Sequence, residues 1–262
     1  MTNDELYDEL MEIDFFKEGI HPEYTPFIGE DFHKFRILHI GESHYIPNYP
    51  EENRITLDDF DGWWSGEQSE SLNAEKGWFN TRQVVSDYMD GSRTKAHGIF
   101  TNTLKSFCKV VTPGEAFDSI SIENSKKYNY FAYMNFYQQP SIYHGMNFTR
   151  SLYLAGEYLN WDSETIDEMW YKIFDESVRI VENVIEILEP QAVVITSNEI
   201  YEYYRDYGSA NEKNQRVAGK LIDDDRMIWV DHPGSPWWNR AKNDEQTSKM
   251  KFEDSLRKIY CE

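Results

Sequence analysis

Cysteine is scarce in this chain of 262 residues, which has only Cys108 and Cys261. Two thiols are too few for a disulfide framework, a thiolate zinc site or an iron–sulfur cluster, because each of these needs more ligands at defined spacing. The scarcity favours a reducing compartment. We therefore expect neither a metal nor another cofactor.

Long apolar runs are also missing from the sequence. No stretch reaches the roughly 20 consecutive apolar residues that cross a bilayer. The first residues are acidic, whereas a secretion signal begins with basic residues and continues with apolar ones. We expect a cytoplasmic protein with no membrane partner.

Positive charge is in short supply, with 26 Lys and Arg against 47 Asp and Glu and a formal net charge of -21. Nucleic-acid binding draws much of its affinity from neutralising phosphates, so a DNA-binding function would need a basic patch that works against the overall potential. The simplest interpretation of the acidity is a solvated surface that keeps the protein in solution.

Short apolar segments alternate with segments of helical periodicity. We predict strands at 35–40, 128–136, 192–196 and 227–230, and helices at 1–20, 97–110, 176–188, 198–204 and 252–260, with an irregular segment at 46–82. This alternation is typical of a parallel sheet covered on both faces by helices. The prediction is one α/β domain over 1–262, of three-layer α/β/α type, with a mainly parallel four-stranded sheet. A helical extension is expected at 1–30 and a helical insertion at 141–175.

Polar residues follow each of the four predicted strands. They are Gly41 to Tyr45 after the first strand, Asn135 after the second, Ser197 and Asn198 after the third, and His232 to Pro236 after the fourth. Open α/β sheets bind ligands in the crevice beyond the carboxyl ends of their strands. We therefore predict that these residues converge in one cleft.

The order of these residues resembles that of the uracil-DNA glycosylase superfamily. In that family a loop that starts with Gly, a base-reading Asn and a late His-Pro-Ser-type loop surround a flipped base. The resemblance spans residues 35–259 by order and spacing, and it implies a glycosylase-like fold. It also implies binding of a nucleobase-containing ligand and hydrolysis of its N-glycosidic bond, with uracil-containing or single-stranded DNA as the expected partner.

The resemblance assigns base-binding roles to Gly41, Tyr45 and Asn135. The Asn135 amide would read the pyrimidine edge, and Tyr45 would block a thymine methyl group or stack beside the base. His232 would donate a hydrogen bond to the base carbonyl as negative charge develops on the leaving base.

The first loop departs from the family at the position that orients the attacking water. Ser43 stands where the family has Asp or Asn, so Glu42 or His44 would have to take over this catalytic role. At the rim, Ser235, Trp237 and Arg240 would approach a phosphate or stack on the ligand.

Each assignment has a structural alternative. His232 could hydrogen-bond within a turn, and Asn135 could satisfy main-chain groups at the end of a strand. Glu42 and His44 could be solvated loop residues, and Trp237 could pack at the rim of the cleft.

Two other functions stay open. A non-catalytic member of the fold that binds a partner is favoured by Ser43 and by the net charge of -21. An esterase-like hydrolase would use Ser43 and His44, but Tyr45 stands where the Gly-x-Ser-x-Gly nucleophile pattern requires its last glycine. The sequence makes no prediction of oligomeric state.

Overall fold

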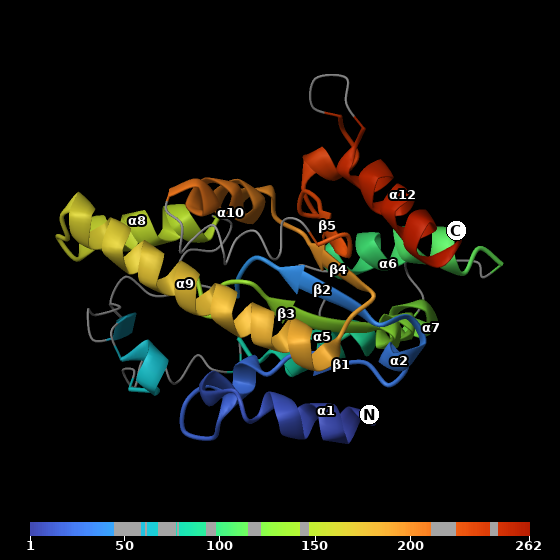
Figure 1. Cartoon of the computed structure of the whole chain (residues 1–262), viewed down its shortest axis with the longest axis horizontal. Coiled ribbons are helices and arrows are strands. Elements are labelled where there is room, and N and C mark those ends of the chain that lie inside the picture. Colours follow the sequence, from blue (N-terminus) through green and yellow to red (C-terminus); the bar gives the residue numbers. More distant parts are fainter. Residues whose placement is uncertain are drawn as a thin grey trace. The chain divides into compact units, whose positions relative to one another are not determined.

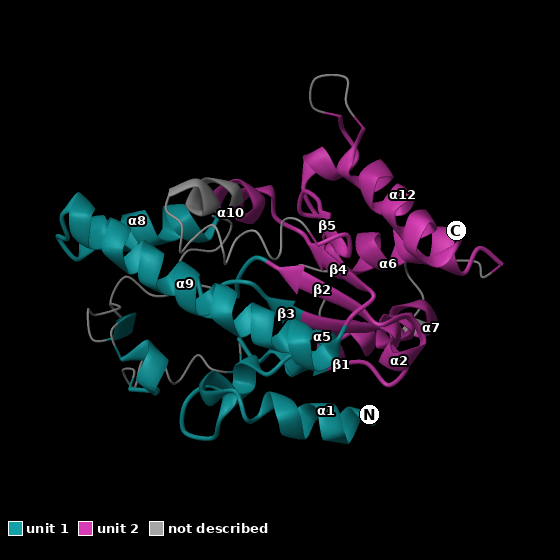
Figure 2. Cartoon of the chain, in the orientation of Figure 1, with its two compact units in different colours: residues 1–27, 42–85, 134–189 teal, residues 28–41, 86–133, 190–262 magenta. Residues whose placement is uncertain are grey.

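The computed structural model describes residues 1–44, 59–60, 62–67, 77, 79–92, 98–114, 122–141, 147–210, 224–241 and 246–262. The chain divides into two compact units, each assembled from three separate stretches (Figure 2). Unit 1 holds residues 1–27, 42–85 and 134–189, and unit 2 holds residues 28–41, 86–133 and 190–262. The single domain expected from the sequence stays a prediction.

The fold is α/β, built on a five-stranded sheet with the order β1-β3-β2-β4-β5 (Figure 1). The strands are β1 (Phe27–Ile28), β2 (Ile37–Gly41), β3 (Phe131–Asn135), β4 (Ala192–Ile195) and β5 (Met227–Trp229). Strand β4 pairs in parallel with β2 on one side and with β5 on the other. All residues of β2, β3 and β4 are buried, which explains why these strands read as continuous apolar runs.

The prediction of four strands is wrong in number, because β1 adds a fifth at the edge. Next to β1, the Gly29 N–H donates to the Phe131 carbonyl (2.9 Å) and the Asp31 N–H to the Asn129 carbonyl (3.0 Å). Residue numbers rise on one side of these bonds and fall on the other, so the edge is antiparallel and the sheet is mixed. The sequence does not reveal β1, because a strand of two residues is too short to show the alternation of apolar and polar residues that identifies a strand. The strand predicted at 128–136 is also shorter, because residues 126–130 form the 3₁₀ helix η5 (Lys126–Tyr130).

Along the chain, the helices of unit 2 come before, between and after these strands. They are α2 (Phe32–Phe35), α6 (Gly98–Val111), α7 (Ile122–Ser125), α10 (Asn198–Ala210), the 3₁₀ helix η6 (Pro236–Trp238) and α12 (Ser248–Tyr260). Helix α12 packs against both α6 and β5. The apolar face predicted for α6 is confirmed, since Ile99, Phe100, Leu104, Phe107 and Cys108 are all buried.

Unit 1 contains α1 (Asn3–Leu10), α8 (Phe148–Tyr158), α9 (Ser163–Leu188) and the 3₁₀ helices η1 (Asp14–Phe16), η2 (Pro22–Tyr24) and η3 (Trp63–Ser65). Helix α5 (Thr81–Met89) crosses from unit 1 into unit 2 along the chain. Helix α9 packs against α1 and α8.

The helix predicted at 1–20 ends at Leu10, and the one predicted at 176–188 begins at Ser163, after the N-cap Asp162. Residues 46–58, from the predicted irregular segment, lie outside the described residues.

No helix in the described part of the chain is both long enough and apolar enough to cross a membrane. Even α9, with 26 residues, carries acidic side chains along its length, together with the basic residues Lys172 and Arg179.

Candidate functional site

In unit 1, the structure places the loop after β2 beside the segment that follows Asn135. The Tyr137 N–H donates to the Glu42 carbonyl (2.9 Å), and the Ser141 N–H donates to the His44 carbonyl (2.7 Å). We call residues 42–44 and 135–141 the loop pair. Asn135 is only 4% exposed. The loop pair thus places the main chain of the predicted catalytic residues 42–44 beside the segment that begins at the predicted base-reading residue Asn135.

The Glu42 side chain holds the start of helix α8. Its carboxylate oxygen Oε1 accepts a hydrogen bond from the Phe148 N–H (2.9 Å), and Phe148 is the first residue of the helix. Main-chain N–H groups at a helix amino terminus lack partners within the helix, and the helix dipole favours a negative charge there. This contact gives Glu42 a structural role, whatever chemistry it performs.

Ser43 and His44 do not form a nucleophile and base. The Ser43 hydroxyl is buried, with the residue 7% exposed, and has no hydrogen-bond partner in the described part of the chain. The His44 Nε2 atom lies 3.0 Å from the Thr81 hydroxyl, which in turn donates to the Tyr24 carbonyl. Because Thr81 donates its single hydroxyl hydrogen to Tyr24, its oxygen must accept the hydrogen on Nε2 of His44. This nitrogen of His44 is therefore bonded to Thr81 and not to Ser43. An esterase needs a base bonded to its serine, and this pair does not provide one.

Gln138 braces the segment after Asn135. Its side-chain amide donates to the main-chain carbonyls of Asn135 and Phe136, and its own N–H donates to the Ser177 hydroxyl (3.1 Å). Its carbonyl accepts from the indole N–H of Trp63 at 2.8 Å. These bonds satisfy buried groups that would otherwise destabilise the fold, and they fix the main chain at the end of β3.

In unit 2, the structure defines the protonation state of His232. The Gly234 N–H donates to the Nδ1 atom of this ring at 3.0 Å. Because Nδ1 is the acceptor, the single hydrogen of the neutral imidazole must lie on Nε2. Burial lowers the pKa of His232 below its usual value. At neutral pH the side chain is therefore an uncharged donor through Nε2.

The main chain on either side of His232 is held at two points. The Asp231 carboxylate accepts hydrogen bonds from the Asn198 amide and from the Ser248 hydroxyl (2.7 Å), and Ser248 also accepts from the Asp231 N–H (3.0 Å). Asn102 on α6 donates to the Pro233 carbonyl at 2.8 Å. These bonds fix the main chain on both sides of the imidazole, and a donor that is fixed in advance can stabilise developing charge without reorganising.

A second histidine of unit 2, His39, is fully buried within β2. Its Nδ1 atom lies 2.6 Å from the Tyr128 hydroxyl, and its Nε2 atom lies 3.4 Å from the Thr196 hydroxyl, which itself donates to the Ile40 carbonyl. Burial lowers the pKa of His39 to about 3, with a smaller contribution from repulsion by His232 when that ring is protonated. His39 is therefore neutral and structural. The sequence offered no signal for it, because it stands in the middle of an apolar run.

The predicted rim residues follow His232 along the chain. Trp237 is 48% exposed on η6, Arg240 is exposed, and the Ser235 hydroxyl is buried without a partner in the described part of unit 2. Gly41 is the last residue of β2, and Tyr45 lies outside the described residues.

The loop pair belongs to unit 1, whereas His232 and the rim belong to unit 2. Their convergence in one cleft stays a prediction. Among the residues with a described placement, no three His, Cys, Asp or Glu side chains gather as a metal site requires.

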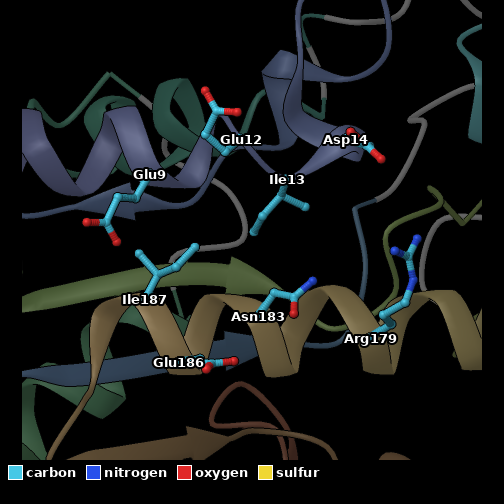
Figure 3. Close-up of a pocket in the computed structure, with 8 residues that line it drawn as sticks. All are labelled: Glu9, Glu12, Ile13, Asp14, Arg179, Asn183, Glu186 and Ile187. Atoms are coloured by element: carbon cyan, nitrogen blue, oxygen red, sulfur yellow. The ribbon is translucent and has the colours of Figure 1, made fainter.

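A cavity of about 290 Å³ lies elsewhere in unit 1, between the end of α1 and helix α9 (Figure 3). Its lining carries the carboxylates of Glu9, Glu12, Asp14 and Glu186 and the guanidinium of Arg179. Four carboxylates repel a phosphate, and no predicted site residue lines this cavity. It is therefore separate from the predicted nucleobase site.

No family model matches the chain, and neither a curated protein nor a solved structure matches it.

Proposed function

We propose that the protein binds a nucleobase-containing ligand and hydrolyses its N-glycosidic bond, with His232 as the hydrogen-bond donor to the departing base. The observation that supports this proposal is the bond from the Gly234 N–H to Nδ1, which leaves Nε2–H as the donor. The three-layer arrangement of the uracil-DNA glycosylase type belongs to the same proposal. Its support is the polar loop that follows each of the parallel strands β2, β4 and β5.

The chemistry explains why a neutral donor suits this reaction. When the N-glycosidic bond breaks, the bonding electrons leave with the base, and the sugar gains oxocarbenium character until water adds to its anomeric carbon. The added water gives up one proton to solvent, and the departing base anion takes one up, so the products are the free base and the sugar with a hydroxyl group. A donor at the base carbonyl oxygen stabilises the negative charge there. Losing one such donor raises the barrier by about 3 to 4 kcal/mol. A neutral imidazole can fill this role without first taking up a proton, and burial of His232 keeps it neutral.

Glu42 and Asn135 take the complementary roles in this proposal. A carboxylate stabilises positive charge on the sugar, and an amide offers both a donor and an acceptor to a base edge. The placement of both residues on the loop pair supports these roles.

The ligand is one that presents few phosphates. A net charge of -21 opposes a long polyanion, whereas a nucleoside or a short single strand meets less repulsion. Uracil-containing or single-stranded DNA is therefore the first class to test, together with free nucleosides.

A second candidate function is binding without catalysis. It is favoured by Ser43, which stands where a water-orienting carboxylate or amide would be needed and whose hydroxyl has no partner in the described part of the chain. This protein would hold the ligand but leave its N-glycosidic bond intact.

One assay separates the two functions. Single- and double-stranded oligonucleotides that carry uracil, hypoxanthine or a mismatch, and the matching nucleosides, are incubated with the protein. Abasic sites or free bases are then measured, and binding is followed in parallel. We expect product from the native chain and a kcat about 10²- to 10³-fold lower for His232→Ala. The matched control is His33→Ala, which removes an exposed histidine of the same unit and should leave the rate unchanged.

Two results would count against this proposal. Binding without product on every substrate would assign the non-catalytic function. Equal rates for the native chain and His232→Ala would remove His232 from the chemistry. The pH profile adds a check, because the neutral ring is the active form and the rate should fall only when the pH drops below the lowered pKa of His232.

A further inference from the structure

The turn after His232 controls which nitrogen of its ring carries the hydrogen. Two hydrogen bonds close this turn. The Ser235 N–H donates to the His232 carbonyl (2.8 Å), and the Gly234 N–H donates to the His232 Nδ1 atom (3.0 Å). The second bond can form only while the peptide group between Pro233 and Gly234 keeps its orientation.

Asn102 holds that same peptide group from its other side. The Pro233 carbonyl, which accepts from the Asn102 amide at 2.8 Å, and the Gly234 N–H belong to one peptide unit. In a planar trans peptide the C=O and N–H bonds point in opposite directions. A donor that fixes the carbonyl therefore aims the N–H, and here the N–H is aimed at the imidazole. Hydrogen bonds linked through one peptide group also strengthen each other.

Two glycines allow this close arrangement. A Cβ atom on Gly234 would lie 3.0 Å from Cε1 and 3.1 Å from Nδ1 of His232, so the ring packs directly on the main chain. A Cβ atom on Gly98, the first residue of α6, would lie 3.2 Å from the Gly234 Cα atom. All three distances are shorter than most real Cβ atoms tolerate. The start of α6 and the turn are therefore packed tightly together, with Asn102 one helical turn further along.

We infer that Asn102 is a positioning residue for His232, which keeps the imidazole in its Nε2–H tautomer by orienting the Pro233–Gly234 peptide group. Its importance for catalysis rests on the proposed function, whereas its effect on the tautomer does not. The sequence contains no pattern that would link Asn102 to His232.

The direct test is the ring nitrogen NMR spectrum of the full chain labelled with ¹⁵N-histidine. Correlations from ring carbon-bound hydrogens to the two nitrogens distinguish a protonated nitrogen from an unprotonated one. The signal of His232 is identified by its loss in His232→Gln. In the native chain we expect an unprotonated Nδ1 and a protonated Nε2.

In Asn102→Ala the ratio of the two tautomers should shift about fivefold toward Nδ1–H, the factor that one typical hydrogen bond supplies. Asn102→Asp keeps the size of the side chain but loses its donor, so it should shift the ratio in the same direction. Lys105→Ala, at an exposed position on the same helix, should leave the native tautomer unchanged. An unchanged tautomer in both Asn102 variants would overturn the inference.

Gly234→Ala provides an independent check if the Asn102 variants fold poorly. The added Cβ atom must displace the ring, so the tautomer should shift although Asn102 is intact. If folded Gly234→Ala kept the native tautomer, this would contradict control of the His232 tautomer by the Gly234 N–H.

The glycosidic assay separates the inference from the proposed function. If both hold, Asn102→Ala should lower kcat by up to about fivefold, because the Nε2–H fraction can fall no further than the tautomer ratio shifts, and it should leave KM unchanged. A tautomer shift in a protein that makes no product on any substrate would support the positioning role and refute the proposed function. A large rate loss with the native tautomer would refute the positioning role.

Discussion

The buried histidine of β2 makes the stability of the protein depend on pH. Burial lowers the pKa of His39 to about 3, whereas an unfolded histidine titrates near 6.5. Between these two values the unfolded chain binds a proton that the folded chain does not. The free energy of unfolding must therefore fall as the pH drops below 6.5.

The size of this effect follows from the shift. Each pH unit inside the window removes about 1.4 kcal/mol, so about 3 kcal/mol is lost between pH 6.5 and pH 4. Other groups also titrate in this range, which means that the native chain alone cannot isolate the contribution of His39. The comparison with His39→Gln isolates it, because glutamine is neutral throughout.

At pH 7, His39→Gln should be less stable than the native chain by about 1 to 3 kcal/mol, since the Tyr128 hydroxyl loses its buried partner. As the pH falls, only the native chain pays the cost of keeping His39 neutral. The difference between the two proteins should therefore shrink by about 1.4 kcal/mol per pH unit below 6.5 and vanish or reverse by pH 4.

Urea unfolding at pH 7, 6, 5 and 4 measures both free energies under the same conditions. A difference that stays constant across this series would refute the reasoning, because it would mean that His39 takes up its proton equally in both states. A matched variant, His33→Gln, changes an exposed histidine and should follow the native chain at every pH.

Three further predictions concern unit 1 and are checked by urea unfolding at pH 7. Ser43→Ala should leave stability unchanged or raise it by about 1 kcal/mol, because the buried hydroxyl has no partner in the described part of the chain; a loss above 1 kcal/mol would show that the hydroxyl makes a stabilising bond. Glu42→Ala should lower stability by about 1 kcal/mol through the lost Phe148 N–H bond, and equal stability would show that the helix start needs no cap there. Trp63→Phe should lower it by about 1 to 3 kcal/mol because the Gln138 carbonyl loses its donor, whereas a neutral result would contradict this brace.

Helices with a single apolar stripe were the features best predicted from the sequence. The buried face of α6 follows from residues that repeat at helical spacing within a few turns, so local pattern suffices. The start of α9 was missed because its first half carries many charged residues, although Asp162 caps it locally. Strand β1 was missed because its two residues become a strand only through their pairing with β3.

The same distinction between local sequence pattern and long-range contact applies to the candidate site. The amino-acid sequence is enough to place Gly41 and Asn135 at the ends of apolar strands and His232 shortly after one, because apolar runs and the glycine that interrupts them are local properties of the chain. The hydrogen-bond partners of these residues depend on contacts that form when the chain folds. Asn102 and Pro233 meet across 131 residues, and the hydrogen on His232 is assigned by a main-chain N–H, a group that every residue except proline carries and that no sequence pattern distinguishes.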